Sequence, residues 1–132
     1  MSMYPIWYEI LKRGTKIMEE VKQFDVWSCD FSDYGGLKGY GVRPCVVISN
    51  DLNNKYSDRV TVVPLTTQAK NPLPTHCIIS STSYTSFALC ENVTMVLKES
   101  LYQKFGSLNE FERKNIMYCV SKQFEIITIK GE

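Results

Sequence analysis

The sequence predicts an α+β protein, mainly β: a small, strongly curved barrel with helical additions. Five short segments have the apolar, β-branched or aromatic composition of strands. The connections between the second, third and fourth of them are too short to hold crossover helices, which argues against parallel βαβ units. One apolar-periodic segment near the C-terminus follows a helix-start signal. The length of 132 residues fits one domain.

The N-terminal stretch is expected to be helical. Apolar positions recur among charges over residues 4–22, with a break near Gly14, which indicates one or two short helices. Residues 1–22 therefore form a predicted N-terminal helical extension, and residues 23–132 form the main domain.

The predicted strands cover residues 24–31, 43–49, 59–65, 75–80 and 87–97. The fifth alternates with period two, which places Phe87, Leu89, Glu91, Val93 and Met95 on one face. Loops are predicted where glycine, asparagine and aspartate gather, over residues 32–41, 50–58 and 66–74.

The C-terminal part is predicted to be helical. A helical turn is expected over residues 98–104. Ser107 stands three residues before Glu110, which is the spacing of a capping box and predicts a helix over 108–122. Its broad apolar side would carry Leu108, Phe111, Ile116, Cys119 and Val120. The tail FEIITIKGE has a β-type composition and could add a late strand.

Composition excludes several classes of protein. The formal net charge of +1 gives no global attraction to nucleic acid, so such a partner would have to bind a local patch. No apolar run is long enough to span a membrane, and the N-terminus lacks the pattern of a signal peptide. Five cysteines without a CxxC motif predict buried free thiols in a cytoplasmic protein.

The reactive residues and motifs present exclude several kinds of functional site. The single histidine, His76, has no converging partners at metal-ligand spacing, so neither a metal nor a cofactor is expected. Serine-hydrolase, P-loop and dinucleotide motifs do not occur. The segment GGLKGYG lacks a strand-to-helix context, and a flexible loop explains it.

Two features point more sharply to a site. Arg43 leaves a glycine loop in GVRP and enters an apolar strand, and its guanidinium could bind a phosphate. The alternative is an edge arginine whose charged head stays in water. Thr66, Thr67 and Gln68 end the third strand, with Lys70 beyond them, and could hold a phosphate or a base edge. Ordinary turn polarity is the alternative there.

Taken in order, these segments resemble a known family. The strings are DVWSCDF, a glycine loop, GVRPCVVISND, an asparagine-rich loop, VTVVPLTTQ, LPTH and ALCENV. Together they resemble the MazF/PemK family of toxin endoribonucleases over about residues 23–122. The resemblance implies an SH3-like barrel of the CcdB/PemK type, a homodimer and a cognate antitoxin partner.

The resemblance also implies a reaction and a set of site residues. Family members cut single-stranded RNA at short sequences without a metal, through attack of the 2′-hydroxyl on the adjacent phosphate. Arg43 and Thr66 match the catalytic arginine and threonine of the family. The residues expected to contact RNA are Lys38, Tyr40, Asn50, Thr67, Gln68, Lys70, His76 and Asn92. His76 has a second interpretation, as a local hydrogen-bonding residue.

Some positions depart from the family pattern. Phe24 stands where a glycine usually precedes the first strand's aspartate, Lys38 replaces part of an acidic–amide pair, and Thr94 replaces an arginine. Two alternative functions therefore stay open. One is a CcdB-like poison that binds gyrase, and the other is a catalytically weakened RNA-binding module on the same fold.

Overall fold

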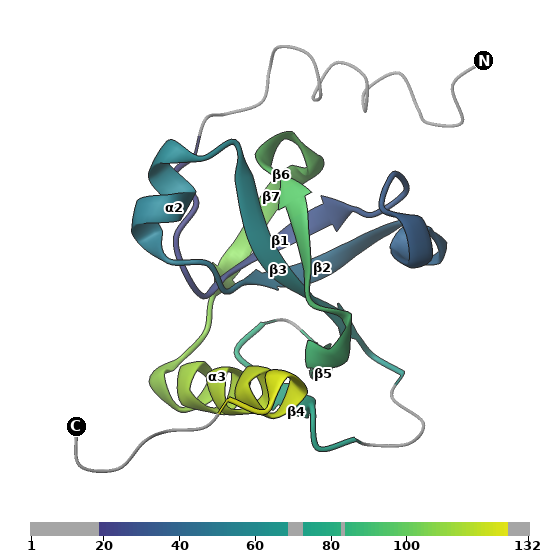
Figure 1. Ribbon diagram of the computed structural model, residues 1–132, viewed down its shortest axis with the longest axis vertical. Helices are drawn as coiled ribbons and strands as arrows, with labels where there is room; N and C mark the ends of the chain where they lie inside the picture. The colour runs from purple at the N-terminus through teal and green to yellow at the C-terminus, as the bar shows by residue number, and fades with distance from the viewer. Residues whose placement is uncertain (1–18, 69–72, 83, 127–132) are drawn as a thin grey trace.

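An antiparallel sheet lies at the centre of the computed structural model, which describes residues 19–68, 73–82 and 84–126 (Figure 1). Within these residues the sheet has seven strands, in the order β4-β5-β3-β2-β1-β7, with β6 pairing β3. The strands are β1 (Asp25–Asp30), β2 (Val42–Val47), β3 (Arg59–Thr66), β4 (His76–Ile79), β5 (Ser86–Leu89), β6 (Thr94–Leu97) and β7 (Leu101–Ser107). The predicted mainly-β, antiparallel architecture is confirmed.

Strand β3 gives the sheet its curvature, because three strands share its two edges. One edge pairs with β2, and the register joins Cys45 to Pro64. The other edge pairs first with β6 and then with β5. The sheet therefore divides along β3 and curls, as the crossing strands in Figure 1 show. The first four predicted strands are confirmed to within two residues at each end.

The prediction of one strand over residues 87–97 was wrong. A 3-10 helix, η2 (Cys90–Asn92), separates β5 from β6, and the two strands pair with different parts of β3. The period-two face predicted from Phe87 to Met95 is broken at this helix. The pattern of side chains does not mark the ends of a three-residue 3-10 turn, so alternation alone did not reveal the break.

Two predicted loops contain helices instead. Residues 50–58 include α2 (Asp51–Tyr56), because the Asn50 side chain accepts a hydrogen bond from the Asn53 N–H at 2.8 Å and so caps the helix. Residues 32–41 include the 3-10 helix η1 (Gly35–Tyr40). The turn predicted over 98–104 is only η3 (Lys98–Ser100), and β7 follows it directly.

The late helix is confirmed, but it begins later than predicted. Helix α3 (Glu110–Phe124) has its capping box at Asn109 and Glu112, and Ser107 belongs to β7. Phe111, predicted on the buried side, is 72% exposed, because Glu112 takes the inward position beside it. Glu125, in a left-handed conformation, ends the helix. The late strand predicted for the tail falls mostly outside the described residues.

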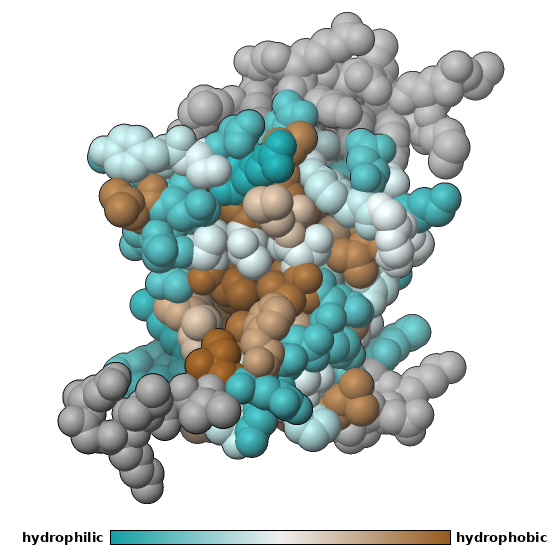
Figure 2. Space-filling view, in the orientation of Figure 1, coloured by the Kyte–Doolittle hydropathy of each residue, from teal (hydrophilic) through white to brown (hydrophobic). Residues whose placement is uncertain are grey.

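The core lies on both faces of the central strands. One buried cluster contains Val46, Val63 and Leu65 and is covered by α3 through Ile116 and Val120. The other contains alternate residues of the same strands, together with residues from β6 and β7. Apolar side chains also reach the surface in a band between the strands and α3 (Figure 2). Burial on both faces explains why β2 and β3 have nearly continuous apolar sequences.

All five cysteines are free and buried, as the sequence predicted. Burial raises the pKa of the Cys119 thiol to about 11 and that of the Cys45 thiol well above its ordinary value. These two side chains therefore stay protonated at neutral pH and act as small apolar residues. Among the described residues, no helix has both the length and the apolar character needed to cross a membrane.

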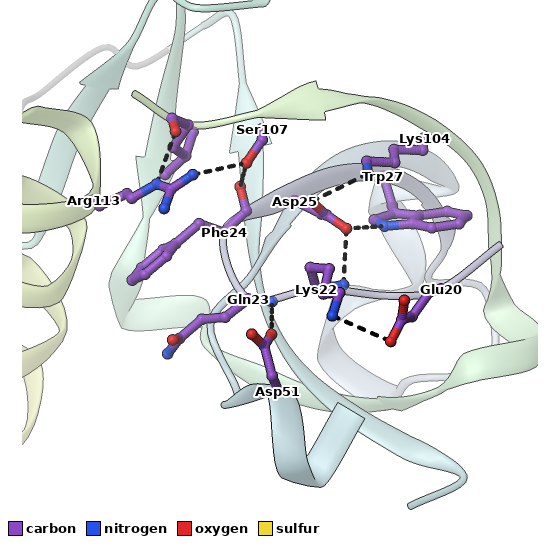
Figure 3. A network of polar contacts seen from close by, with 11 residues as sticks. Glu20, Lys22, Gln23, Phe24, Asp25, Trp27, Asp51, Lys104, Ser107 and Arg113 are labelled. Atoms are coloured by element: carbon purple, nitrogen blue, oxygen red, sulfur yellow. Dashed lines mark hydrogen bonds and ion pairs between the residues drawn. The ribbon is translucent and has the colours of Figure 1, made fainter. Parts of the chain in front are cut away.

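The junction before β1 ties three parts of the chain together (Figure 3). The buried Asp25 carboxylate accepts hydrogen bonds from the Lys22 N–H at 2.8 Å and the Trp27 indole at 3.4 Å, and it pairs with Lys104 of β7 at 3.5 Å. The Arg113 guanidinium of α3 lies 5.4 Å from the centre of the Phe24 ring. The predicted helical extension lies mostly outside the described residues, and its described part, residues 19–22, is not helical.

Candidate active site

Arg43 and Thr66 lie at the ends of neighbouring strands. At this end of the two strands, the last paired residues are Cys45 of β2 and Pro64 of β3. Arg43 stands two residues before Cys45, and Thr66 stands two residues after Pro64. Both side chains line one cavity of about 190 Å³. The antiparallel pairing of two apolar strands therefore brings together residues that are 23 positions apart in the sequence.

A local turn orients the Arg43 side chain. Gly41 has φ of +60°, a conformation that glycine adopts without strain and that lets η1 end and β2 begin. The turn presents the Tyr40 carbonyl, which accepts a hydrogen bond from Arg43 Nε at 2.9 Å. The side chain is exposed, and the two terminal Nη groups have no partner among the described residues. They can therefore bind an anion in the manner of a fork.

Thr66 is held by the turn that follows β3. Its Oγ1 accepts a hydrogen bond from the Gln68 N–H at 3.1 Å, so its own hydroxyl hydrogen can point to a ligand. Thr67 also lines the cavity, whereas Gln68 is exposed beside it. Lys70, which the sequence also indicated, lies outside the described residues.

The side chains of Tyr40 and Asn92, which belong to two separate 3-10 helices, contact each other. The Asn92 amide donates a hydrogen bond to the Tyr40 hydroxyl at 2.6 Å and so joins η2 to η1. The Tyr40 ring packs edge-on against the buried Phe31, with ring centres 6.2 Å apart. Neither residue lines the cavity, and their contacts with RNA stay a prediction.

His76 is nearly buried in β4 and has partners on both ring nitrogens. Nδ1 accepts a hydrogen bond from the Leu73 N–H at 3.2 Å, and Nε2 lies 2.7 Å from Glu91 Oε2. This pattern favours the neutral ring that donates from Nε2. Burial raises the pKa of the Glu91 carboxyl, but the bonds from His76, its own backbone and Thr75 outweigh burial and leave that pKa below its ordinary value. The geometry favours the local hydrogen-bonding role for His76.

Two other predicted RNA contacts lie away from the cavity lining. Lys38 is exposed in η1, on the connection that leads to Arg43. Asn50 follows the opposite end of β2, where its side chain caps α2. The structure gives Asn50 a structural task that sequence reasoning did not assign to it.

The cavity also has lining residues that sequence reasoning missed. Tyr84 and Thr82 come from the connection between β4 and β5, Ser86 from the start of β5, and Phe105 from β7. The aromatic residue in the serine- and threonine-rich connection was the available signal. Phe105 had none, because β7 was not predicted as a strand.

The lining favours an anionic ligand with an apolar part. Arg43 is the charged member among the ten described residues that line the cavity, and the others are apolar or carry hydroxyl groups. No cluster of three or more metal-ligating side chains occurs in the part of the chain that the structure describes. A fixed cation beside hydroxyl donors can stabilise negative charge that develops on a phosphate.

Comparison with known proteins identifies the family. Residues 22–124 match the model of the PemK-like, MazF-like toxins of type II toxin–antitoxin systems. The chain belongs to this family. A curated relative in the PemK/MazF family, endoribonuclease MazF of Staphylococcus saprophyticus, is 30% identical over 116 residues, which are 84% of this chain and 97% of the relative. Endoribonuclease EndoA of Bacillus subtilis is 36% identical over 95 residues, 68% of this chain and 82% of EndoA.

A solved structure shares the fold of this PemK/MazF chain. It is a mycobacterial endoribonuclease in complex with its cognate antitoxin, with a TM-score of 0.71 and 22% identity. The match covers 83% of this chain and 99% of the mycobacterial one. The antiparallel sheet with its C-terminal helix is therefore the fold of a MazF-type toxin.

Proposed function

We propose that this chain is the endoribonuclease toxin of a type II toxin–antitoxin pair and cuts single-stranded RNA at short sequences without a metal. The observation that carries the proposal is the meeting of Arg43 and Thr66 in one cavity, where the described lining residues include no carboxylate. Two relatives are named endoribonucleases, and both match most of this chain.

The proposed reaction is an internal transfer of the phosphoryl group. The 2′-oxygen attacks the adjacent phosphorus and loses its proton, while the bond from phosphorus to the 5′-oxygen breaks and that oxygen gains a proton. The products are a 2′,3′-cyclic phosphate and a 5′-hydroxyl end. Arg43 stabilises the charge on the pentacoordinate phosphate, and Thr66 donates a hydrogen bond to it. Catalysis then rests on positioning and electrostatics.

The remaining RNA contacts are assigned from the resemblance to the family. Thr67 and Gln68 extend from the end of β3, and Lys38 stands on η1 before Arg43. These residues would bind bases and phosphates that flank the cleaved bond. The same proposal includes Lys70, Tyr40, Asn50, His76 and Asn92 as contacts.

We also infer the domain bounds, the binding partners and the cellular location of this chain. We assign the sheet to the SH3-like barrels, residues 23–132 to the toxin domain and residues 1–22 to an N-terminal extension. The antitoxin complex of the mycobacterial relative supports a cognate antitoxin for this chain, which we expect to be a homodimer. Five free thiols suit a cytoplasmic protein.

The test is cleavage of a long single-stranded RNA in the presence of EDTA, followed by analysis of the new ends. We expect cyclic phosphate and 5′-hydroxyl ends from the wild type. Thr66→Val keeps the shape of the side chain but lacks the hydroxyl, so it should cut more slowly. Thr61→Val, in the same strand but outside the cavity lining, is the control. RNA that is bound but left intact by the wild type would favour the weakened RNA-binding module instead.

A further inference from the structure

The cavity beside Arg43 and Thr66 has aromatic walls that the proposed chemistry does not use. Tyr84, in the connection before β5, is 76% exposed, and Phe105, in β7, is 50% exposed. Single exposed aromatic residues are common on protein surfaces. These two come from separate parts of the chain and line the same cavity.

We propose that this cavity is a base pocket, which holds one nucleobase next to the cleaved phosphate and stacks it on Tyr84 and Phe105. The inference rests on the proposed function, because it places the RNA phosphate at Arg43. Flat aromatic rings bind bases of single strands through their π-faces, with little dependence on the identity of the base.

The volume fits one ring system. The cavity holds about 190 Å³, whereas pockets for drug-sized ligands hold about 300–1,000 Å³. Val26 and Leu65 belong to the buried core and give the cavity an apolar wall. A nucleobase would therefore be sheltered from water while its phosphate stays with Arg43.

Hydroxyl groups supply the polar contacts that a base requires. Thr67, Thr82 and Ser86 line the cavity, and a hydroxyl can either donate or accept a hydrogen bond. Thr82 Oγ1 also donates to the Tyr84 carbonyl at 3.0 Å, which helps to fix the turn that presents the ring. The pocket is partly preorganised, and this limits the entropy lost on binding.

The occupant that the lining favours is RNA rather than an acidic peptide side chain. Arg43, the charged group among the described lining residues, lies at the position proposed for the phosphate, and the aromatic part carries no charge. An antitoxin segment that fills the cavity with an apolar side chain is the competing occupant, and the experiment separates the two.

The experiment combines protein variants with abasic RNA. After the cleavage site has been mapped, two oligonucleotides are made that lack the base on the 5′ or the 3′ side of the cut but keep the ribose. For the wild type, one of them should lower kcat/KM by about 5- to 150-fold, the range expected for one stacked base. Tyr84→Ala and Phe105→Ala should lower kcat/KM on intact RNA, and the abasic position should then cost them little more.

Control variants distinguish the loss of a stacking contact from a loss of folding. Tyr84→Phe keeps the ring, so the coupling to the abasic position that Tyr84→Ala loses should be retained. Tyr56→Ala removes an equally exposed ring, 74% exposed on α2, and should keep the full abasic effect. If the losses from the variant and from the abasic site simply multiply, the base pocket is wrong. Loss of antitoxin binding by Tyr84→Ala without coupling to either abasic site would assign the cavity to the antitoxin. A wild type that leaves every RNA intact would instead contradict the proposed function.

Discussion

Phe24 shows at the scale of one residue how this chain departs from its family. It has φ of +71°, in the left-handed region that glycine enters freely and other residues enter at a cost of about 1–2 kcal/mol. The family resemblance indicates glycine at this place. The phenyl ring offsets part of the strain, because it packs against the core cluster under α3 and contacts the Arg113 guanidinium.

Two substitutions at Phe24 separate the strain from the packing. Phe24→Ala loses the ring but keeps the strain, whereas Phe24→Gly loses the ring and relieves the strain. We therefore expect the glycine variant to be the more stable of the two by about 1 kcal/mol. Urea denaturation of both variants measures this difference. An alanine variant as stable as the glycine variant would contradict the account of the backbone.

Some residues of the site could be predicted from the sequence, and others could not. Arg43 and Thr66 were predicted because strand-end motifs carry them, and the structure brings both to one cavity. Tyr84 and Phe105 were not predicted, because their proximity depends on the packing of two connections that are distant in the sequence. Local patterns do not encode such a meeting.

At the scale of elements, one buried carboxylate of α3 adds polar contacts to the apolar packing of this helix on the sheet. Glu112 completes the capping box with Asn109 and also accepts hydrogen bonds from the backbone N–H groups of Ser80 at 2.6 Å and Ser81 at 3.2 Å. Burial raises the pKa of the Glu112 carboxyl, but hydrogen bonds from Ser81, Ser80 and Asn109 outweigh burial and leave that pKa below its ordinary value. The folded state therefore favours the charged form.

This arrangement predicts how the stability of the protein depends on pH. Because the folded pKa is lowered, the stabilisation by Glu112 is present above the ordinary glutamate value of about 4.3 and is lost as the pH falls through the folded value. At pH 7, Glu112→Gln should lower the free energy of unfolding by about 1–3 kcal/mol. The exposed Glu110→Gln should change it by less than about 0.5 kcal/mol. Urea denaturation at pH 7 and pH 4 tests both, and a Glu112→Gln deficit that stays constant at pH 4 would contradict this account.

The elements that the sequence predicted well are those with a strong apolar pattern. Strands β2 and β3 are buried on both faces, so their apolar sequences identify them. Helix α2 was missed because its six residues are mostly polar, and a single cap at Asn50 begins it. The division between β5 and β6 depends on pairing with two parts of β3, which is a property of the tertiary structure.

At the scale of the whole molecule, the net charge of +1 agrees with a site that binds RNA through few ionic contacts. Among the described residues that line the cavity, Arg43 is the charged one and none is acidic. Such a protein recognises a short stretch of RNA through local contacts rather than by covering a long backbone. For RNA binding, the position of Arg43 therefore matters more than the net charge of the whole chain.

The role of Arg43 is tested by the rate of RNA cleavage under single-turnover conditions in EDTA. We expect Arg43→Ala to slow cleavage by about 10²–10³-fold, the loss expected for one preorganised electrostatic group. Arg59→Ala, at the start of β3 and outside the cavity lining, should cleave at nearly the wild-type rate. Equal rates for Arg43→Ala and the wild type would contradict the claim that Arg43 binds the reacting phosphate.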